Sequence, residues 1–128
     1  MKKILIAICL FGVTLVYSQK FRIDYDIVSM YDMETKTWDK FEPGYNTFVM
    51  NYNSNNDIMH IRADGKSIIY RKISEVEEGN VTGTGEHYQI ITALDGEGNR
   101  FRFQIFDDPG LGLKMIYGDV MIQFAKSN

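Results

Sequence analysis

The chain has little cysteine, proline or tryptophan. Its one cysteine, Cys9, lies in an apolar stretch near the N-terminus, and we expect it to be removed with a signal peptide. The remaining sequence has no cysteine, which excludes disulfides, thiol nucleophiles and thiolate metal ligands there. A small exported domain without disulfides must depend on a well-packed core for its stability.

The first 18 residues have the pattern of a secretory signal peptide. Two lysines precede an apolar segment from Ile4 to Val16, and the small side chain of Ser18 suits cleavage before Gln19. A membrane-spanning helix needs about 20 apolar residues, and this segment is shorter. We therefore predict a signal peptide over residues 1–18, and an exported protein that is either periplasmic or secreted and has no retained membrane span.

Strong helix formers are scarce in residues 19–128. This segment has three alanines and three leucines, against twelve isoleucines, five valines and fifteen aromatic residues. β-Branched and aromatic side chains favour strands, whereas alanine and leucine favour helices. The composition therefore predicts a single all-β domain.

Clustered basic residues are absent as well. The net charge is −3 for the whole chain and −5 once Lys2 and Lys3 are removed, and the other Lys and Arg residues are scattered. Proteins that bind nucleic acid carry a basic patch or stripe that faces the phosphates. The sequence therefore argues against a nucleic-acid partner.

Apolar and polar residues alternate with a period of two, as in half-buried strands. The clearest alternation covers residues 21–27, 101–105 and 120–124. Other segments with strand composition are 35–41, 45–52, 58–62, 67–75, 87–94 and 113–117. No segment shows a capped apolar stripe with the period of about 3.6 residues that marks an amphipathic helix.

Turn residues separate these segments. Asp64-Gly65 predicts a two-residue type I′ hairpin, and 95–99, 108–110 and Gly118-Asp119 predict further hairpin connections. Short connections favour antiparallel neighbours, because parallel strands need long crossovers. We predict a meander of about eight to nine strands that closes into a barrel, which removes exposed edges. A two-layer β-sandwich is the alternative.

In strand number and hairpin connectivity, this layout resembles the calycin type of barrel, which includes lipocalins and fatty-acid-binding proteins. Lipocalins usually carry a Gly-x-Trp motif on their first strand. Here the sole tryptophan, Trp38, follows Thr37 and lies after the first predicted strand. The resemblance therefore implies a fold, and no ligand-binding residue of that family can be assigned to this chain.

The sequence contains no recognisable catalytic or metal-binding motif. His60 and His87 are the two histidines, and neither belongs to a His-x-His or His-Glu-x-x-His pattern. The adjacent acids at 77–78 and 107–108 point to opposite faces of a strand, so neither pair forms a ready carboxylate dyad. We predict no catalytic residue, metal or cofactor, and an enzyme that uses either histidine with an acidic partner remains an alternative.

Two loops partly match ligand-binding motifs. The glycine-rich segment 79–85 lacks the Gly-Lys-Ser/Thr ending of a phosphate-binding loop. Residues 95–99 alternate oxygen-bearing side chains with glycines, but lack the distal glutamate of an EF-hand. Both are interpreted as hairpin connections.

The aromatic and methionine residues are the strongest sign of a function. An eight-stranded barrel is wide enough either to be filled by side chains or to hold one small ligand, and we favour the filled core. If the barrel is hollow, it is a non-catalytic protein that binds a small apolar or amphipathic ligand through Trp38, Tyr45, Tyr52, Tyr70 and His60. The alternative is a module that binds or inhibits an envelope protein through an outer sheet face or the polar loop 51–57.

Overall fold

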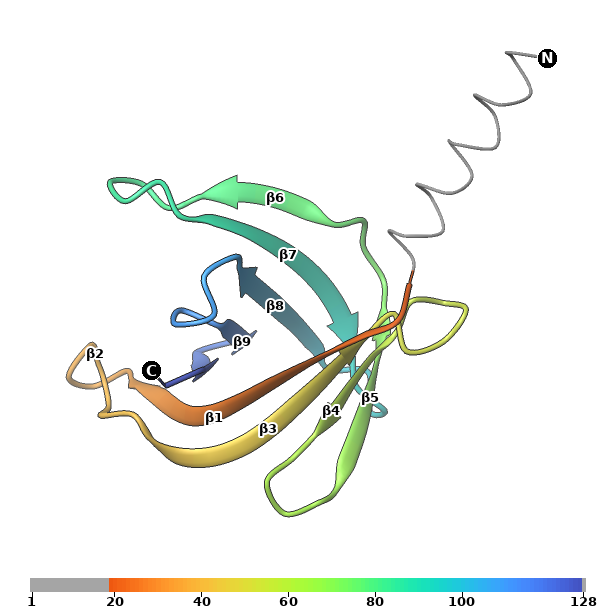
Figure 1. Ribbon diagram of the computed structural model, residues 1–128, viewed down its shortest axis with the longest axis horizontal. Coiled ribbons are helices and arrows are strands. Elements are labelled where there is room, and N and C mark those ends of the chain that lie inside the picture. The colour runs from red at the N-terminus through yellow and green to blue at the C-terminus, as the bar shows by residue number, and fades with distance from the viewer. Residues whose placement is uncertain (1–18, 128) are drawn as a thin grey trace, which may run out of the picture.

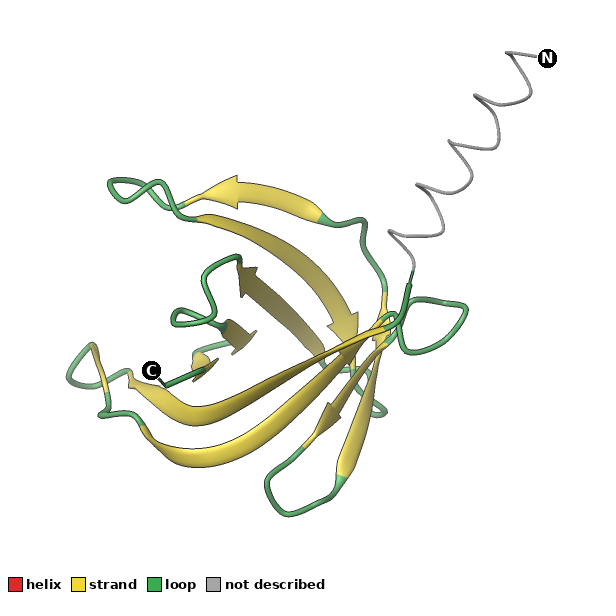
Figure 2. Cartoon of the chain, in the orientation of Figure 1, coloured by secondary structure: helices red, strands yellow, loops and turns green. Residues whose placement is uncertain are grey.

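The structure is a computed structural model that describes residues 19–127 (Figure 1). The predicted signal peptide, residues 1–18, lies outside the described residues. Within the described range the regular elements are all strands (Figure 2), so this range has no helix that is long and apolar enough to cross a membrane.

Ten strands follow one another along the described chain. They are β1 (Phe21–Asp32), β2 (Thr37–Trp38), β3 (Glu42–Met50), β4 (Ile58–Ile61), β5 (Ser67–Lys72), β6 (Glu77–Asn80), β7 (His87–Leu94), β8 (Arg100–Phe106), β9 (Leu113–Tyr117) and β10 (Val120–Ala125).

Eight of these strands form a closed antiparallel barrel in the order β1-β3-β4-β5-β7-β8-β9-β10. The barrel closes because β10 pairs with β1, from Ile27 opposite Ala125 to Met30 opposite Ile122. The short strand β2 pairs with the end of β1, and β6 pairs with β7. The predicted barrel is confirmed and the sandwich alternative is wrong. The eight-stranded closed meander is also compatible with a calycin-like layout.

The barrel wall has two short ladders, which we call the β3–β4 seam and the β5–β7 seam. At the β3–β4 seam only Thr47, Phe48 and Val49 of β3 pair with β4, and β3 curves away from the β4–β5 hairpin (Figure 1). At the β5–β7 seam only Arg71 and Lys72 pair with β7. Beyond Lys72, β6 takes the place of β5 beside β7.

The packed core lies inside the barrel. Its largest fully buried side chains are Phe48, Phe103, Ile58 and Leu113. The ring of Phe48 contacts those of Phe103 and Phe124 edge to face, with centroid distances of 6.3 Å and 5.1 Å. Edge-to-face geometry is the favoured arrangement of buried aromatic rings. Phe103 and Phe124 come from apolar positions of the predicted alternation, whereas Phe48, Ile58 and Leu113 lie in segments predicted as strands from their composition.

One predicted turn differs in type. The Asp64-Gly65 hairpin is not a two-residue type I′ turn, because only Gly65 has a positive φ (85°) and the N–H of Arg62 donates to the carbonyl of Lys66 at 2.8 Å. The loop therefore has three residues, with glycine in the left-handed position. The β9–β10 turn is the two-residue form, and Gly118 provides its positive φ of 55°.

Two strand predictions also change. The predicted strand 35–41 shrinks to β2, because Asp32 accepts the backbone N–H groups of Glu34 and Thr35 and so starts a tight turn. Strand β6 falls in a region interpreted as a connection. Its pairing with β7 brings the ring of Tyr88 over Gly79, where a Cβ would lie 2.7 Å from the Tyr88 side chain, so glycine suits this position.

Candidate binding cavity

A cavity of about 790 Å³ lies inside the barrel wall beside the β3–β4 seam. Its lining comes from β1, the segment before β3, β3 itself, the β4–β5 hairpin, β9 and β10. The residues are Val28, Ser29, Met30, Asp39, Lys40, Glu42, Asn46, His60, Arg62, Ala63, Asp64, Ile68, Tyr70, Met115, Ile122 and Phe124. Because β3 and β4 stop pairing at Thr47, the wall does not close over this space.

The lining is apolar inside and charged only where it is exposed. The inner wall contains buried or half-buried Met115, Phe124 and Ile122, together with Val28 and Ile68. All five charged residues of the lining are exposed and so form a rim: Asp39, Lys40, Glu42, Arg62 and Asp64. A largely apolar pocket with a few placed polar groups is the usual form of a small-molecule site.

The buried polar groups of the cavity include the pair formed by His60 and Asn46. His60 is 5% exposed and Asn46 is 8% exposed. The Nε2 atom of His60 lies 2.9 Å from Oδ1 of Asn46. Because a carbonyl oxygen only accepts hydrogen bonds, Nε2 carries the proton and donates it to Asn46. The amide N–H groups of Asn46 therefore remain outside this bond.

His60 is held in its neutral form. Its ring stacks on Phe48 with a centroid distance of 4.3 Å and an interplanar angle of 9°, and Phe124 contacts its edge at 5.4 Å. Burial among these groups, reinforced by the positive charge of Arg62, lowers the pKa of His60 to about 4. The neutral ring has one acceptor, Nδ1, which is buried and has no hydrogen-bond partner among the described residues.

Tyr70 also lines the cavity, and its ring joins the cavity to the packed core. It contacts Phe101 and Phe103 edge to face, each with a centroid distance of 5.0 Å. Burial, with a smaller effect of Asp95, raises the pKa of Tyr70 above its ordinary value. Tyr70 and His60 are thus the two sequence-predicted ligand residues that the fold brings together here.

The other three predicted residues lie elsewhere. Trp38 packs against Tyr31 with a centroid distance of 5.3 Å, and the ammonium of Lys114 lies 5.2 Å from the Trp38 ring. Tyr45 is 76% exposed and borders a shallow pocket of about 220 Å³. Tyr52 follows β3, with the ammonium of Lys20 5.2 Å from its ring. None of the three lines the large cavity.

Sequence reasoning missed most of the lining. Ile122 and Phe124 lie in a segment predicted as an alternating strand, and Met30 and Met115 are among the methionines noted above. No sequence pattern marked any of the four as a site residue. No pattern in the sequence indicated Asn46 as a lining residue. It faces inward because β3 places it opposite the buried Tyr25, and this register is a tertiary property.

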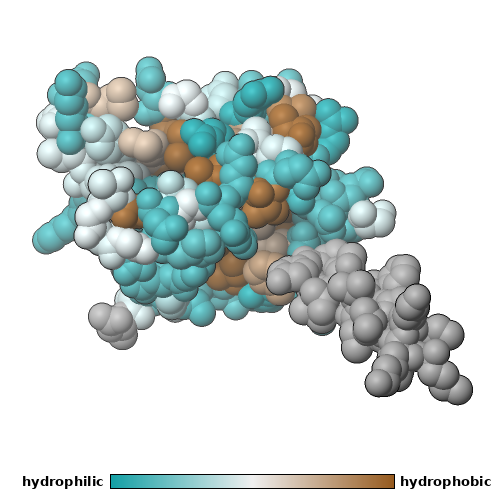
Figure 3. Space-filling model, turned by 90° about the horizontal axis from the view of Figure 1, so that it is seen from above, coloured by the Kyte–Doolittle hydropathy of each residue, from teal (hydrophilic) through white to brown (hydrophobic). Residues whose placement is uncertain are grey.

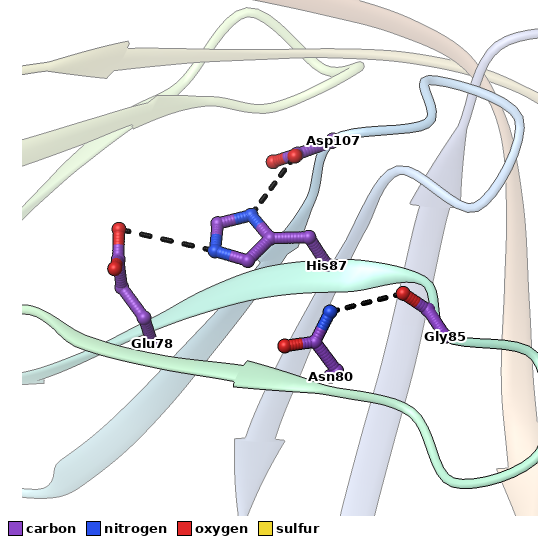
Figure 4. Close-up of polar contacts among 5 residues, drawn as sticks. All are labelled: Glu78, Asn80, Gly85, His87 and Asp107. Carbon is purple, nitrogen blue, oxygen red and sulfur yellow. Dashed lines mark hydrogen bonds and ion pairs between the residues drawn. The ribbon is translucent and has the colours of Figure 1, made fainter.

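The second histidine has a different environment (Figure 4). His87, on β7, has Nδ1 2.8 Å from a carboxylate oxygen of Asp107 and Nε2 3.8 Å from one of Glu78 on β6. The side chain is 34% exposed. The hydrogen bond to Asp107, and after it the charges of Asp107 and Glu78, raise the pKa of His87. The cluster joins β6 and β7 to the residue that follows β8.

Aspartates tie down two polar loops, 95–99 and 51–57. Asp95 accepts the backbone N–H groups of Glu97 and Asn99 and the side-chain amide of Asn99. Asp57 accepts the side-chain amide of Asn53 and the N–H of Lys72. These carboxylates hold their loops closed. Within residues 19–127, no group of three or more His, Cys, Asp or Glu side chains is placed to hold a metal ion.

Some large apolar side chains remain at the surface. On the face in Figure 3, hydrophobic patches lie between hydrophilic side chains. Among residues 19–127, ten large hydrophobic residues have exposed fractions of 40% or more: Phe21, Met30, Met33, Phe41, Tyr45, Ile69, Ile73, Val76, Tyr117 and Val120. Met30 belongs to the cavity lining, and Ile73 and Val76 lie in the segment between β5 and β6.

Comparison of the chain with protein-family models, with curated proteins and with solved structures found no match.

Proposed function

We propose that this protein is an exported, non-catalytic binding protein that holds a small apolar or amphipathic ligand in the barrel cavity. The observation that carries the proposal is a space of about 790 Å³ with apolar inner walls and a buried polar pair, His60 and Asn46. Small-molecule sites typically have volumes of roughly 300–1,000 Å³ and this kind of lining. The basic and apolar N-terminal segment supports export, to the periplasm or beyond it.

The chemistry around the cavity supports binding in preference to catalysis. His60 is neutral and its Nε2 proton is engaged by Asn46. The proposed role resembles that of the lipocalins, and the closed eight-stranded barrel is compatible with their calycin layout. Ligand binding here would depend on the shape and the polarity of the lining.

A neutral fluorescent probe tests the proposal. N-phenyl-1-naphthylamine emits strongly in apolar surroundings, so titration into the protein encompassing residues 19–128 should give a saturable rise in emission. Trp38 is a poor reporter because it packs against Tyr31, away from the lining. The substitution Val28→Phe places a ring in the cavity wall and should weaken probe binding at least tenfold.

Val49→Phe is the matched control. Val49 is half-buried on β3 and does not line the cavity, so this variant should bind the probe as the unchanged protein does. No saturable emission, or equal loss in both variants while both remain folded by circular dichroism, would refute the proposal.

A protein partner is the second candidate, and β6 favours it. This strand pairs with β7 along one edge, and no other described strand pairs with its outer edge. Exposed Ile73 and Val76 lie just before it, whereas Glu77 and Glu78 discourage unspecific strand pairing. An envelope protein that adds a strand here should cross-link to a photoreactive residue at position 78. Cross-linking at position 53, in the 51–57 loop, would place the partner on that loop.

A further inference from the structure

We infer that the outer edge of β6 binds an extended segment of a partner protein that carries two adjacent basic residues. The inference rests on the protein-partner candidate and specifies the chemistry of that partner, and it does not depend on the cavity. Three features of the described residues support it: the outward backbone groups of β6, the acidic residues beside them, and the apolar side chains that precede the strand.

The backbone of β6 directs alternate groups away from the barrel wall. Val81, just beyond β6, donates its N–H to the carbonyl of Glu86 at 2.8 Å, on the β7 side. Successive residues of an antiparallel strand direct their backbone groups to opposite edges. Gly79 therefore faces β7 as Val81 does, whereas Glu78 and Asn80 direct their N–H and C=O groups outward. No other described strand pairs with this edge, and an extended peptide binds such groups as an added strand.

The excess of acidic residues is concentrated beside this edge. Residues 73–99 contain six Asp and Glu and no Lys or Arg, whereas the rest of 19–128 contains eleven Asp and Glu against twelve Lys and Arg. Glu77 and Glu78 are exposed, and neither forms an ion pair with a Lys or Arg of the described chain. The carboxylate of Glu78 lies 3.8 Å from Nε2 of His87 (Figure 4).

The two acids indicate the spacing of the basic residues in the partner. Adjacent side chains of a strand point to opposite faces, so Glu77 and Glu78 present negative charge on both faces of the edge. A partner strand also alternates. Two adjacent Lys or Arg residues therefore provide one positive charge to each face, and opposite charges across a ladder stabilise the pairing.

The same acids disfavour a second copy of this chain as the occupant. Pairing of two β6 strands would bring four glutamates onto one short ladder, and like charges on facing strands are destabilising. Ile73 and Val76, just before β6, are 42% and 40% exposed. Apolar residues beside the basic pair of the partner can pack against them, and this contact adds buried apolar area.

Three fluorescein-labelled hexapeptides test the inference by fluorescence anisotropy with the protein encompassing residues 19–128 at low ionic strength. The first is Thr-Val-Lys-Lys-Val-Thr, and the second has Glu in place of both lysines. The third is the lysine peptide with both lysine backbone nitrogens methylated. The lysine peptide should bind about tenfold more tightly than the glutamate peptide because of the cross-strand charges. It should also bind more tightly than the methylated peptide, which lacks a backbone donor toward β6.

A proline on β6 tests the backbone contact without a change of charge. Asn80→Pro removes an outward N–H and leaves the bonds to β7 in place, so it should weaken binding of the lysine peptide about fivefold. Asn80→Ala is the matched control, because it loses the same side-chain bond to the carbonyl of Gly85 and keeps the backbone N–H. If Asn80→Pro does not fold by circular dichroism, the methylated peptide tests the same contact.

Charge reversal on β6 tests the choice of partner. Glu77→Lys combined with Glu78→Lys should make the glutamate peptide bind more tightly than the lysine peptide. Glu34→Lys combined with Glu97→Lys changes the net charge equally at exposed positions outside β6, so this control should retain the preference for lysine.

The outcomes distinguish the inference from both candidate functions. Equal binding of the three peptides, no binding of the lysine peptide, or a preference for lysine that survives reversal of Glu77 and Glu78 would overturn the inference. Cross-linking of two copies through position 78 would overturn it as well. An envelope protein that cross-links at position 78 while the lysine peptide does not bind would leave the partner candidate and overturn its basic class. Binding of N-phenyl-1-naphthylamine tests the cavity separately.

Discussion

The two seams of the barrel wall differ in how they are covered. At the β3–β4 seam the wall separates over an apolar cavity, and the histidine beside it, His60, is buried and neutral. At the β5–β7 seam the extra strand β6 continues the wall along β7 as far as His87, at the other end of that strand, and His87 is half-buried between two carboxylates. A barrel can thus interrupt its hydrogen-bonded ladder in two ways with opposite chemical results.

The difference shows which seam is suited to a ligand. Beyond the β5–β7 seam, β6 continues the backbone pairing along β7, and at the far end of this ladder His87 pairs with Asp107. The β3–β4 seam leaves volume and an unpaired buried acceptor. This volume and its apolar inner wall make the β3–β4 seam the one suited to a ligand.

The largest expected effect is on stability, and it comes from comparing an isoleucine in the packed core with one at the cavity. Ile58 is fully buried, whereas Ile122 is half-buried and borders the cavity. Ile58→Ala should lower the free energy of unfolding by roughly 3–5 kcal/mol, because it leaves a new void. Ile122→Ala should cost about half as much or less, because it enlarges an existing space. Urea denaturation measures both, and equal losses would mean that the cavity is packed in solution.

The lowered pKa of His60 predicts that the protein loses stability in acid. Its pKa of about 4 lies below the ordinary 6.5, so the unfolded chain binds the proton first as the pH falls. The free energy of unfolding should fall by roughly 3 kcal/mol between pH 6.5 and 4 through this group alone. His60→Gln removes the titration and keeps a donor for Asn46. Its stability, measured at a series of pH values, should fall less steeply than that of the unchanged protein, and parallel curves would contradict the prediction.

The raised pKa of His87 predicts a smaller change of stability with pH, in the opposite direction. Its pKa is raised, so its contribution to stability is present below the ordinary value of 6.5 and is lost as the pH rises through the folded value. Proton NMR should show His87 titrating above 6.5, and Asp107→Asn should lower that pKa because it removes the main cause. An unchanged pKa in this variant would show that Asp107 is not the cause.

Much of the fold was predictable because it depends on local chemistry. Alternation over 101–105 and 120–124 reflects strands with one face in the core, and glycines mark turns that need positive φ. The alternation predicted over 21–27 holds as far as Tyr25, because a register shift between Tyr25 and Ile27 then turns Val28 inward. The exceptions have local physical causes as well. In strand β6 the ring of Tyr88 lies over Gly79, and the Asp64-Gly65 turn gains a residue because Arg62 pairs with Lys66.

The site was predictable only in part. His60 and Tyr70 reach the cavity, but Trp38, Tyr45 and Tyr52 do not, although all five have suitable side chains. Residue type shows that a side chain can line a pocket. It does not show where the pocket lies, since that depends on which strands stop pairing.

By itself the sequence determined the all-β class, the alternation of apolar and polar residues in the strands, and most turns. These follow from side-chain shape and backbone preference within a few residues. The tertiary structure alone decided that the ladder between β3 and β4 ends at Thr47 and that Asn46 meets His60, 14 positions away. Register, barrel closure and the position of a void depend on contacts between distant segments. No local pattern encodes them, because each is settled by how all eight barrel strands pack at once.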